Sequence, residues 1–260
     1  MRKLSRRTRR VQPNQRLWKL GQRPKGRTHR FRWFRAFPFK LFLGILCLYI
    51  GVELFTLPFL SIANLDTQNP KETALMQQRI NEAREKGKKL TIDYRWISLA
   101  NIPQHVRKAI LIAEDDRFFD HAGLDWYEIG ESIETNWEKG RIVRGGSTIT
   151  QQLAKNLYLS TSRDPIRKFK ELLIAWMLEA TLSKKRIFEL YLNIIEWGRG
   201  VFGIEAAAQR YFHKSASQLT KVEGARLAAV ISSPLRHKPT ENTSFLEKKK
   251  EVILQRMSTR

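Results

Sequence analysis

The sequence predicts a mainly α-helical domain that follows a single N-terminal transmembrane helix. Apolar residues recur at helical spacing in one segment after another from about residue 100 onward, and only residues 90–96 alternate with the period of two that a strand would show. Residues 41–60 form a mostly apolar run that contains one charge, Glu53. Twenty residues at helical rise span about 30 Å, the thickness of a hydrocarbon core.

The first 40 residues are strongly basic, with 15 Lys and Arg and no Asp or Glu, whereas the rest of the chain has a net charge of +8. Positive charge before a first membrane helix keeps that end in the cytoplasm. A cleaved signal peptide ending near residues 61–63 is an alternative, but the basic region is too long for one. The tail also interleaves aromatic residues with its charges, as nucleic-acid-binding segments do. Because the tail lies beside a membrane span, we expect it to bind anionic lipid and expect no nucleic-acid partner.

These changes in composition divide the chain into five parts. We expect a basic cytoplasmic tail at 1–40, a transmembrane helix at 41–60, a polar stalk or mobile entry segment at 61–88, the main domain at 89–240 and a C-terminal helix or tail at 241–260. One cysteine and five histidines exclude a disulfide framework and a Cys-rich metal site.

The helices of the main domain are predicted from apolar stripes and from capping residues. Residues 103–114 place Val106, Ile110 and Ala113 on one stripe. Thr148 and Gln151 fit a capping box that begins a helix running to Leu157. A further capping box, Thr220 with Glu223, precedes residues 225–231.

Three more helix starts are predicted at Asp164–Pro165, Ser183 and Gly203. The helix after Ser183 has an apolar face formed by Ile187, Leu190, Tyr191 and Ile194. For the helix after Pro165 we expect the packed face to be formed by Ile166, Phe169, Leu173, Trp176, Met177 and Ala180.

Two segments concentrate polar side chains beside aromatic ones. Residues 113–123 read AEDDRFFDHAG, and residues 145–156 read GGSTITQQLAKN. This density is typical of a site that moves a proton and binds an anionic, sugar-like substrate. Glu114 ends an apolar stripe, so partial burial would raise its pKa and suit it to act as a general base. From the residues alone, a surface ion pair with Arg117 is an equal alternative.

Five segments in order resemble the motifs of the family 51 peptidoglycan glycosyltransferases, and most closely those of its monofunctional branch. They are Glu114–Gly123, Gly145–Asn156, Arg167–Glu171, Lys184–Asn193 and a segment at 200–214. The resemblance implies a lysozyme-like helical fold and a glycosyltransferase domain at 89–240. It also implies polymerisation of lipid II into β-1,4-linked glycan with release of undecaprenyl diphosphate. Because the chain stops at Arg260, we expect no transpeptidase activity.

The resemblance also implies roles for individual residues. Glu114 would be the catalytic base, and Glu171 a second essential carboxylate near the diphosphate. For Glu171, the alternative interpretation is an ordinary ion pair with Arg167. The implied substrate-binding residues are Asp115, Arg117, Ser147, Thr150, Gln151, Gln152, Lys155, Asn156, Arg167 and Lys168. Glu131 departs from the pattern, because many relatives carry a basic residue there.

Other expectations concern cofactors and partners. The spacing of residues shows no metal motif, although the resemblance allows a divalent cation, Mg²⁺ or Mn²⁺, that bridges diphosphate to a carboxylate. The implied partners are lipid II, the growing glycan strand and membrane lipids, with cell-division or wall-synthesis proteins as further candidates. The implied location is the bacterial inner membrane, with a periplasmic catalytic domain. A lysozyme-like hydrolase and a non-catalytic scaffold are the alternatives, since two carboxylates also serve glycan hydrolysis.

Overall fold

The computed structural model describes residues 40–45, 47–48, 51–53, 55–141, 145–162 and 164–259, in two compact units that divide after Thr56. In the first unit, residues 40–45, 47–48 and 51–53 have helical backbone. The predicted basic tail lies outside the described residues except for Lys40. Within the described part of the chain, no helix has the length and apolar content of a membrane span. Four residues of the predicted span at 41–60 are not described, and the span stays a prediction.

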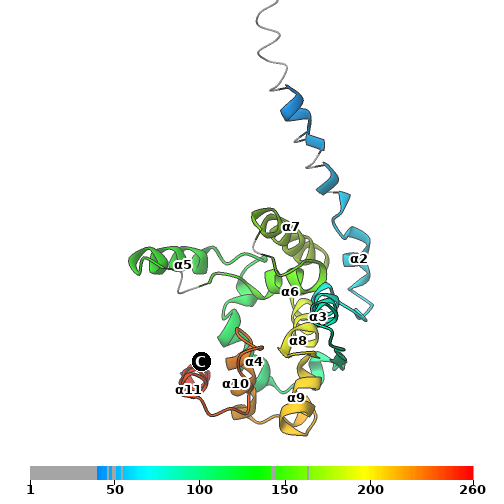
Figure 1. The fold of residues 1–260 in the computed structure, drawn as a ribbon. Helices are drawn as coiled ribbons and strands as arrows, with labels where there is room; N and C mark the ends of the chain where they lie inside the picture. Colours follow the sequence, from blue (N-terminus) through cyan, green and yellow to red (C-terminus); the bar gives the residue numbers. More distant parts are fainter. Residues whose placement is uncertain are drawn as a thin grey trace, which may run out of the picture. The chain divides into compact units, whose positions relative to one another are not determined.

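The second unit is mainly helical, as the sequence predicts (Figure 1). Its helices are α2 (Phe59–Asn64), α3 (Ala74–Glu85), α4 (Gln104–Glu114), α5 (Trp126–Glu138), α6 (Ile149–Tyr158), α7 (Pro165–Thr181), α8 (Lys184–Ile194), α9 (Ile204–Phe212), α10 (Lys221–Val230) and α11 (Ser244–Thr259). Short 3₁₀ turns lie at η1 (Leu99–Asn101), η2 (Phe118–Asp120) and η3 (Ala216–Gln218). The strands are β1 (Asp93–Tyr94), β2 (Glu196–Gly198) and β3 (Val201–Phe202).

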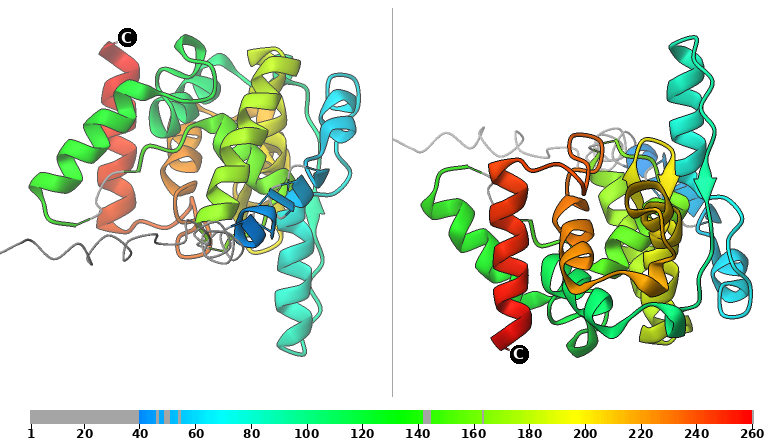
Figure 2. Two further views of the ribbon diagram at one scale, coloured as in Figure 1. Left: turned by 90° about the horizontal axis from the view of Figure 1, so that it is seen from above. Right: turned by 90° about the horizontal axis from the view of Figure 1, so that it is seen from below.

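Helix α8 lies in the centre of the core, and residues 190–194 are all buried. Helices α6, α7 and α9 contact it, while α4 packs against α10 and α11. Figure 2 shows α3 at the opposite edge of the domain from α5 and α11. The packing therefore places the C-terminal helix beside the end of α4 that carries Glu114.

A small three-stranded sheet has the order β1-β3-β2, with β1 parallel and β2 antiparallel to β3. The strand predicted within 90–96 is confirmed at residues 93–94 only, because β3 has two residues and pairs with Asp93 and Tyr94. Gly203 ends this sheet at φ 84°, where a Cβ atom would lie 2.5 Å from the Asn193 carbonyl oxygen. Only glycine fits this turn between β3 and α9.

The predicted helix starts are confirmed. The side chains of Asp164, Ser183 and Thr220 each accept a hydrogen bond from the first turn, and Thr220 forms the full capping box with Glu223. Gly203 precedes α9. At α6 only half of the predicted box forms, because Thr148 caps the Gln151 amide while the Gln151 side chain accepts from Lys168.

The predicted packing face of α7 is wrong at four of its six residues, whereas Leu173 and Met177 do pack against the core. Ile166, Phe169 and Trp176 are 43%, 59% and 67% exposed, and Ala180 is exposed as well. The buried face is instead formed by Glu171, Ile174, Ala175 and Leu178. Helix α7 has apolar residues on two sides, so their spacing did not show which side meets α6. The exposed side is a large apolar surface that a packed core does not explain.

Candidate active site

Glu114 is the last residue of α4 and lies half-buried beside α6. Gln152 Nε2 donates a hydrogen bond to Glu114 Oε2 at 2.9 Å, and Tyr191 Oη donates to Gln152 Oε1 at 3.2 Å. Burial raises the pKa of the Glu114 carboxyl, while the Gln152 hydrogen bond and the charges of Lys249 and Lys155 act in the opposite direction. The predicted direction of this pKa shift is confirmed.

Arg117 does not pair with Glu114, so that alternative is wrong. Its Nε atom lies 3.9 Å from Asp125 Oδ2, and its guanidinium group lies 5.0 Å from the centre of the Tyr127 ring. Glu114 is therefore held by an amide, which leaves its carboxyl group without a cationic hydrogen-bond partner among the described residues.

Asp115 joins the two polar segments that the sequence singles out. One carboxylate oxygen lies 2.9 Å from His121 Nε2, and the other accepts the Ile149 amide at the start of α6, also at 2.9 Å. Thr148 Oγ1 donates to the Gly123 carbonyl oxygen at 2.7 Å, which adds a second link. Gly123 has a φ of 86°, a conformation that favours glycine. These links set α6, and with it Gln152, next to Glu114.

Glu171 is almost fully buried, with its side chain 4% exposed, and both of its oxygens are paired. Arg167 Nη1 donates to Oε2 at 2.7 Å, and Lys168 Nζ pairs with Oε1. Lys168 Nζ also lies 3.3 Å from Gln151 Oε1 and 3.4 Å from Ser147 Oγ. A buried pair of this kind orients its cations firmly, unlike the surface ion pair that the spacing alone allows.

Lys155 is half-buried on α6 and interacts electrostatically with both carboxylates of the predicted site. Burial lowers its pKa, as do the charges of Arg167 and Lys168, whereas Glu171 and Glu114 raise it. Its ammonium group forms no hydrogen bond or ion pair with the described residues, and Lys155 lines neither of the two cavities described next.

Two neighbouring cavities share Gly146 and Ser147. The first, of 260 Å³, contains Glu114 and Asp115. The second, of 370 Å³, joins Ser147, Gln151 and Lys168 to an apolar wall formed by Leu124, Trp126, Ile129, Ile133 and Leu172. A larger cavity of 790 Å³ between η1, α4 and α8 contains none of the predicted site residues.

Some predicted residues lie away from these two cavities. Thr150 is fully buried and its hydroxyl donates to Glu179 Oε1 at 2.5 Å, which serves packing of α6 on α7. Asn156 is buried on α6 and lines neither cavity. Arg117 is directed toward Asp125 and Tyr127.

Helix α11 brings two cations that sequence reasoning missed. The charge of Lys249 reaches Glu114, and its Nζ atom donates to Ser232 Oγ at 2.9 Å. Arg256 lines the first cavity and pairs with Asp116 at 2.7 Å. The two residues are seven positions apart, which is two helical turns. That spacing was the available signal, but nothing in the sequence showed what the helix packs against.

Glu171 does not provide a ready-made metal site. Both of its oxygens already meet cations, and in the described part of the chain Glu171 belongs to no group of three or more potential His, Cys, Asp or Glu ligands. The group of three potential ligands that the described residues do form is Asp115, His121 and Asp125, which the sequence spacing did not suggest.

The model of the transglycosylase family matches residues 81–258 of this chain. The chain belongs to that family. All five segments singled out in the sequence lie inside the matched region, and the resemblance is confirmed.

Curated relatives match over most of their length. The chain is 44% identical to a biosynthetic peptidoglycan transglycosylase of Nitrosospira multiformis, over 88% of this chain and 96% of the relative. A protein of the same name from Methylobacillus flagellatus is 46% identical, over 73% and 82%. Another from Dechloromonas aromatica is 42% identical, over 87% and 95%.

Proposed function

We propose that this transglycosylase polymerises lipid II into β-1,4-linked glycan strands and releases undecaprenyl diphosphate. The observation that carries the proposal is the half-buried Glu114 in one cavity, next to a second cavity that contains Lys168 and an apolar wall and shares Gly146 and Ser147 with the first. The family match and the named relatives support the same reaction. The proposal includes no transpeptidase step, because the matched region covers 96% and 95% of two of these relatives.

In the proposed reaction, Glu114 takes the proton from the 4-hydroxyl group of the acceptor sugar. The resulting oxygen attacks the anomeric carbon of the donor, and the bond from that carbon to the diphosphate breaks with inversion. The raised pKa of Glu114 suits this role, because a base whose pKa lies closer to neutrality accepts a proton more readily. The proton stays on Glu114 and the electron pair leaves with the diphosphate.

The leaving diphosphate gains negative charge that cations must stabilise. Lys155 is the cation with no competing partner among the described residues, and Glu171 holds Arg167 and Lys168 close to it. We assign Lys155, Arg167 and Lys168 to the diphosphate, with Ser147 and Gln151 beside Lys168. Glu171 positions the cations and does not touch the reacting atoms.

The proposed location is the inner membrane, with residues 41–60 as the anchor and the main domain in the periplasm. Support comes from exposed apolar side chains on α5 and α7, of which Trp126 and Ile133 line the second cavity. On α5, Trp126, Ile133 and Trp137 are 74%, 63% and 87% exposed, and α7 adds Phe169 and Trp176. A surface of this kind can enter the interfacial region of a bilayer, where Trp is favoured. A lipid-linked donor would then reach Lys168 along the apolar wall.

The function is tested by incubating detergent-solubilised protein with lipid II and treating the products with a muramidase. We expect a glycan polymer that the muramidase degrades. A folded protein that binds lipid II and makes no polymer would favour a scaffold. Shortening of preformed glycan would favour a hydrolase.

Lys249→Met is expected to move the acidic limb of the pH–rate profile to higher pH. A general base must be deprotonated, so the rate falls as the pH drops through the pKa of Glu114. The Lys249 charge lowers that pKa, and its removal raises it. The measurement is the rate of polymerisation between about pH 4.5 and 8, which lies above the ordinary carboxyl pKa of about 4.3. Lys221→Met, an exposed change on α10, serves as the control, and an unchanged limb in Lys249→Met would contradict the prediction.

The membrane surface is tested by quenching tryptophan fluorescence with brominated lipids in reconstituted vesicles. We expect Trp126→Phe to reduce the quenched fraction, because Trp126 is 74% exposed. Trp197→Phe is the matched control, because Trp197 is fully buried and its Nε1 donates to the Leu227 carbonyl oxygen. Equal quenching in the wild type and Trp126→Phe would count against contact between α5 and the membrane.

A further inference from the structure

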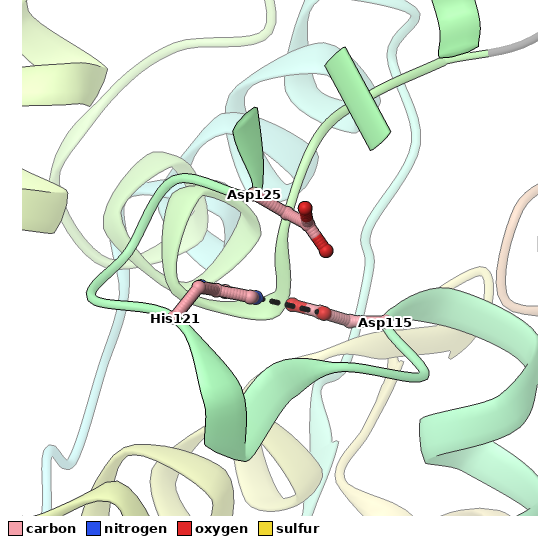
Figure 3. Close-up of side chains that lie close together, drawn as sticks. All are labelled: Asp115, His121 and Asp125. Carbon is pink, nitrogen blue, oxygen red and sulfur yellow. Dashed lines mark hydrogen bonds and ion pairs between the residues drawn. The ribbon is translucent and has the colours of Figure 1, made fainter. Parts of the chain in front are cut away.

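Three side chains from different elements converge next to Glu114 (Figure 3). Asp115 follows α4, His121 follows η2, and Asp125 is the N-cap of α5. One potential ligand atom from each lies within 4.8 Å of the other two. Their side chains are 4%, 8% and 4% exposed, respectively, so the group is almost completely buried.

Two atoms of this group have no hydrogen-bond partner among the described residues, Asp125 Oδ2 and His121 Nδ1. Asp125 uses its other oxygen to accept the Glu128 amide at 3.0 Å, and Figure 3 shows its carboxylate turned toward the His121–Asp115 pair. Arg117 Nε lies 3.9 Å from Oδ2, too far for a hydrogen bond, on a side chain that is 44% exposed. A buried carboxylate oxygen without a hydrogen-bond partner is costly, and a bound ion or a water molecule would satisfy it.

The charge around the group favours a cation. The adjoining cavity of 260 Å³ is lined by Asp115 and Asp125 together with Glu114, Asp116 and Glu128. Arg256 in the same wall pairs with Asp116, and the charge of Lys249 reaches Glu114. A bound cation would reduce the repulsion among these acidic groups, which a neutral water molecule would not do.

We propose that Asp115, His121 and Asp125 bind one divalent cation of the Mn²⁺ or Zn²⁺ class. One imidazole and two carboxylates form a ligand set that suits these ions better than Ca²⁺ or Mg²⁺, which prefer oxygen alone. Adjacent ligands about 2.1 Å from a metal ion lie roughly 3 Å apart at right angles. The 2.9 Å contact between His121 Nε2 and Asp115 Oδ1 is a hydrogen bond in the structure, so binding of an ion by both atoms would release the proton that they share. The Asp125 oxygen lies within 4.8 Å of both atoms and would move closer to complete the set.

The outer contacts support the two carboxylates of the group, whereas His121 Nδ1 has no hydrogen-bond partner among the described residues. Asp115 Oδ2 is fixed by the Ile149 amide and Asp125 Oδ1 by the Glu128 amide, which leaves the opposite oxygens directed inward. The cation would tie the end of α4 to the starts of α5 and α6. It would therefore fix the backbone next to Glu114 from a place separate from Glu171 and its paired cations.

The test uses the full chain in detergent, stripped with EDTA and free of lipid II. Titration with MnCl₂, followed by electron paramagnetic resonance, and with ZnCl₂, followed by calorimetry, should show one ion per chain. Asp125→Asn should weaken binding by at least about tenfold, because it removes a charged ligand, while Asn still caps α5. Mn²⁺ should raise the Tm of the wild type more than that of Asp125→Asn. Glu171→Gln is the control for a site at the diphosphate, and it should bind Mn²⁺ as the wild type does.

Failure of either ion to bind the wild type would overturn the proposal and favour a water molecule between the three side chains. Equal affinity in the wild type, Asp125→Asn and His121→Gln would overturn it as well. Loss of binding in Glu171→Gln alone would move the site to Glu171. If Asp125→Asn does not fold, as judged by circular dichroism, His121→Gln decides the question. No substrate is present, so these outcomes are independent of the proposed polymerisation.

Discussion

Glu114→Gln is expected to lower the rate of lipid II polymerisation by a factor of about 10²–10⁴, the usual contribution of a general base. Glutamine keeps the size of the side chain and can still accept the hydrogen bond from Gln152, which is 2.9 Å long in the structure. The loss would therefore come from the missing proton acceptor. The measurement is the rate at which muramidase-sensitive glycan forms from lipid II.

The matched control is Glu251→Gln, an exposed carboxylate on α11 that pairs with Lys250. It should polymerise like the wild type. If Glu114→Gln also does so, Glu114 is not the base, and the assignment fails even if the family reaction is correct.

The same substitution should stabilise the folded protein at neutral pH. The folded-state pKa of Glu114 is raised above its unfolded value, so the folded protein holds a proton that the unfolded chain releases as the pH rises. Unfolding free energy is therefore highest below the unfolded pKa and falls as the pH passes through the folded one. Glu114→Gln removes the cost of burying an ionised carboxylate, so calorimetry at about pH 7 should give a higher Tm than for the wild type. The difference should shrink as the pH approaches the ordinary carboxyl pKa of about 4.3.

Lys155→Met is the second change with a large expected effect, a loss of about 10²-fold or more in polymerisation rate. Lys155 is a half-buried ammonium group that forms no hydrogen bond or ion pair with the described residues, and the proposed role is to stabilise charge on the leaving diphosphate. Methionine fills a similar volume without the charge. Removing a cation whose pKa is lowered by burial should leave the Tm unchanged or higher.

Lys221→Met on the surface of α10 is the control for loss of one positive charge, and its rate should match the wild type. A Lys155→Met protein with normal polymerisation would assign the diphosphate to Arg167 and Lys168 alone. A large fall in Tm would instead show that Lys155 supports the fold.

Local features of the fold were predictable because they depend on neighbours in the chain. The caps at Asp164, Ser183 and Thr220 use a side chain and an amide two or three residues away. The apolar stripe of Val106 and Ile110 is also read within one helix. The packing face of α7 was not predictable, because both sides carry apolar residues and only the position of α6 distinguishes them.

The sequence by itself determined the helices, the family segments and the two carboxylates with their polar neighbours. Tertiary structure decided which of these groups meet: Gln152 with Glu114, Lys168 with Gln151, and Asp125 with the His121–Asp115 pair. It also brought Lys249 from the last helix to Glu114. The physical reason is that caps and stripes are short-range along the chain, whereas burial and electrostatic interactions depend on distance in space, which the order of residues does not specify.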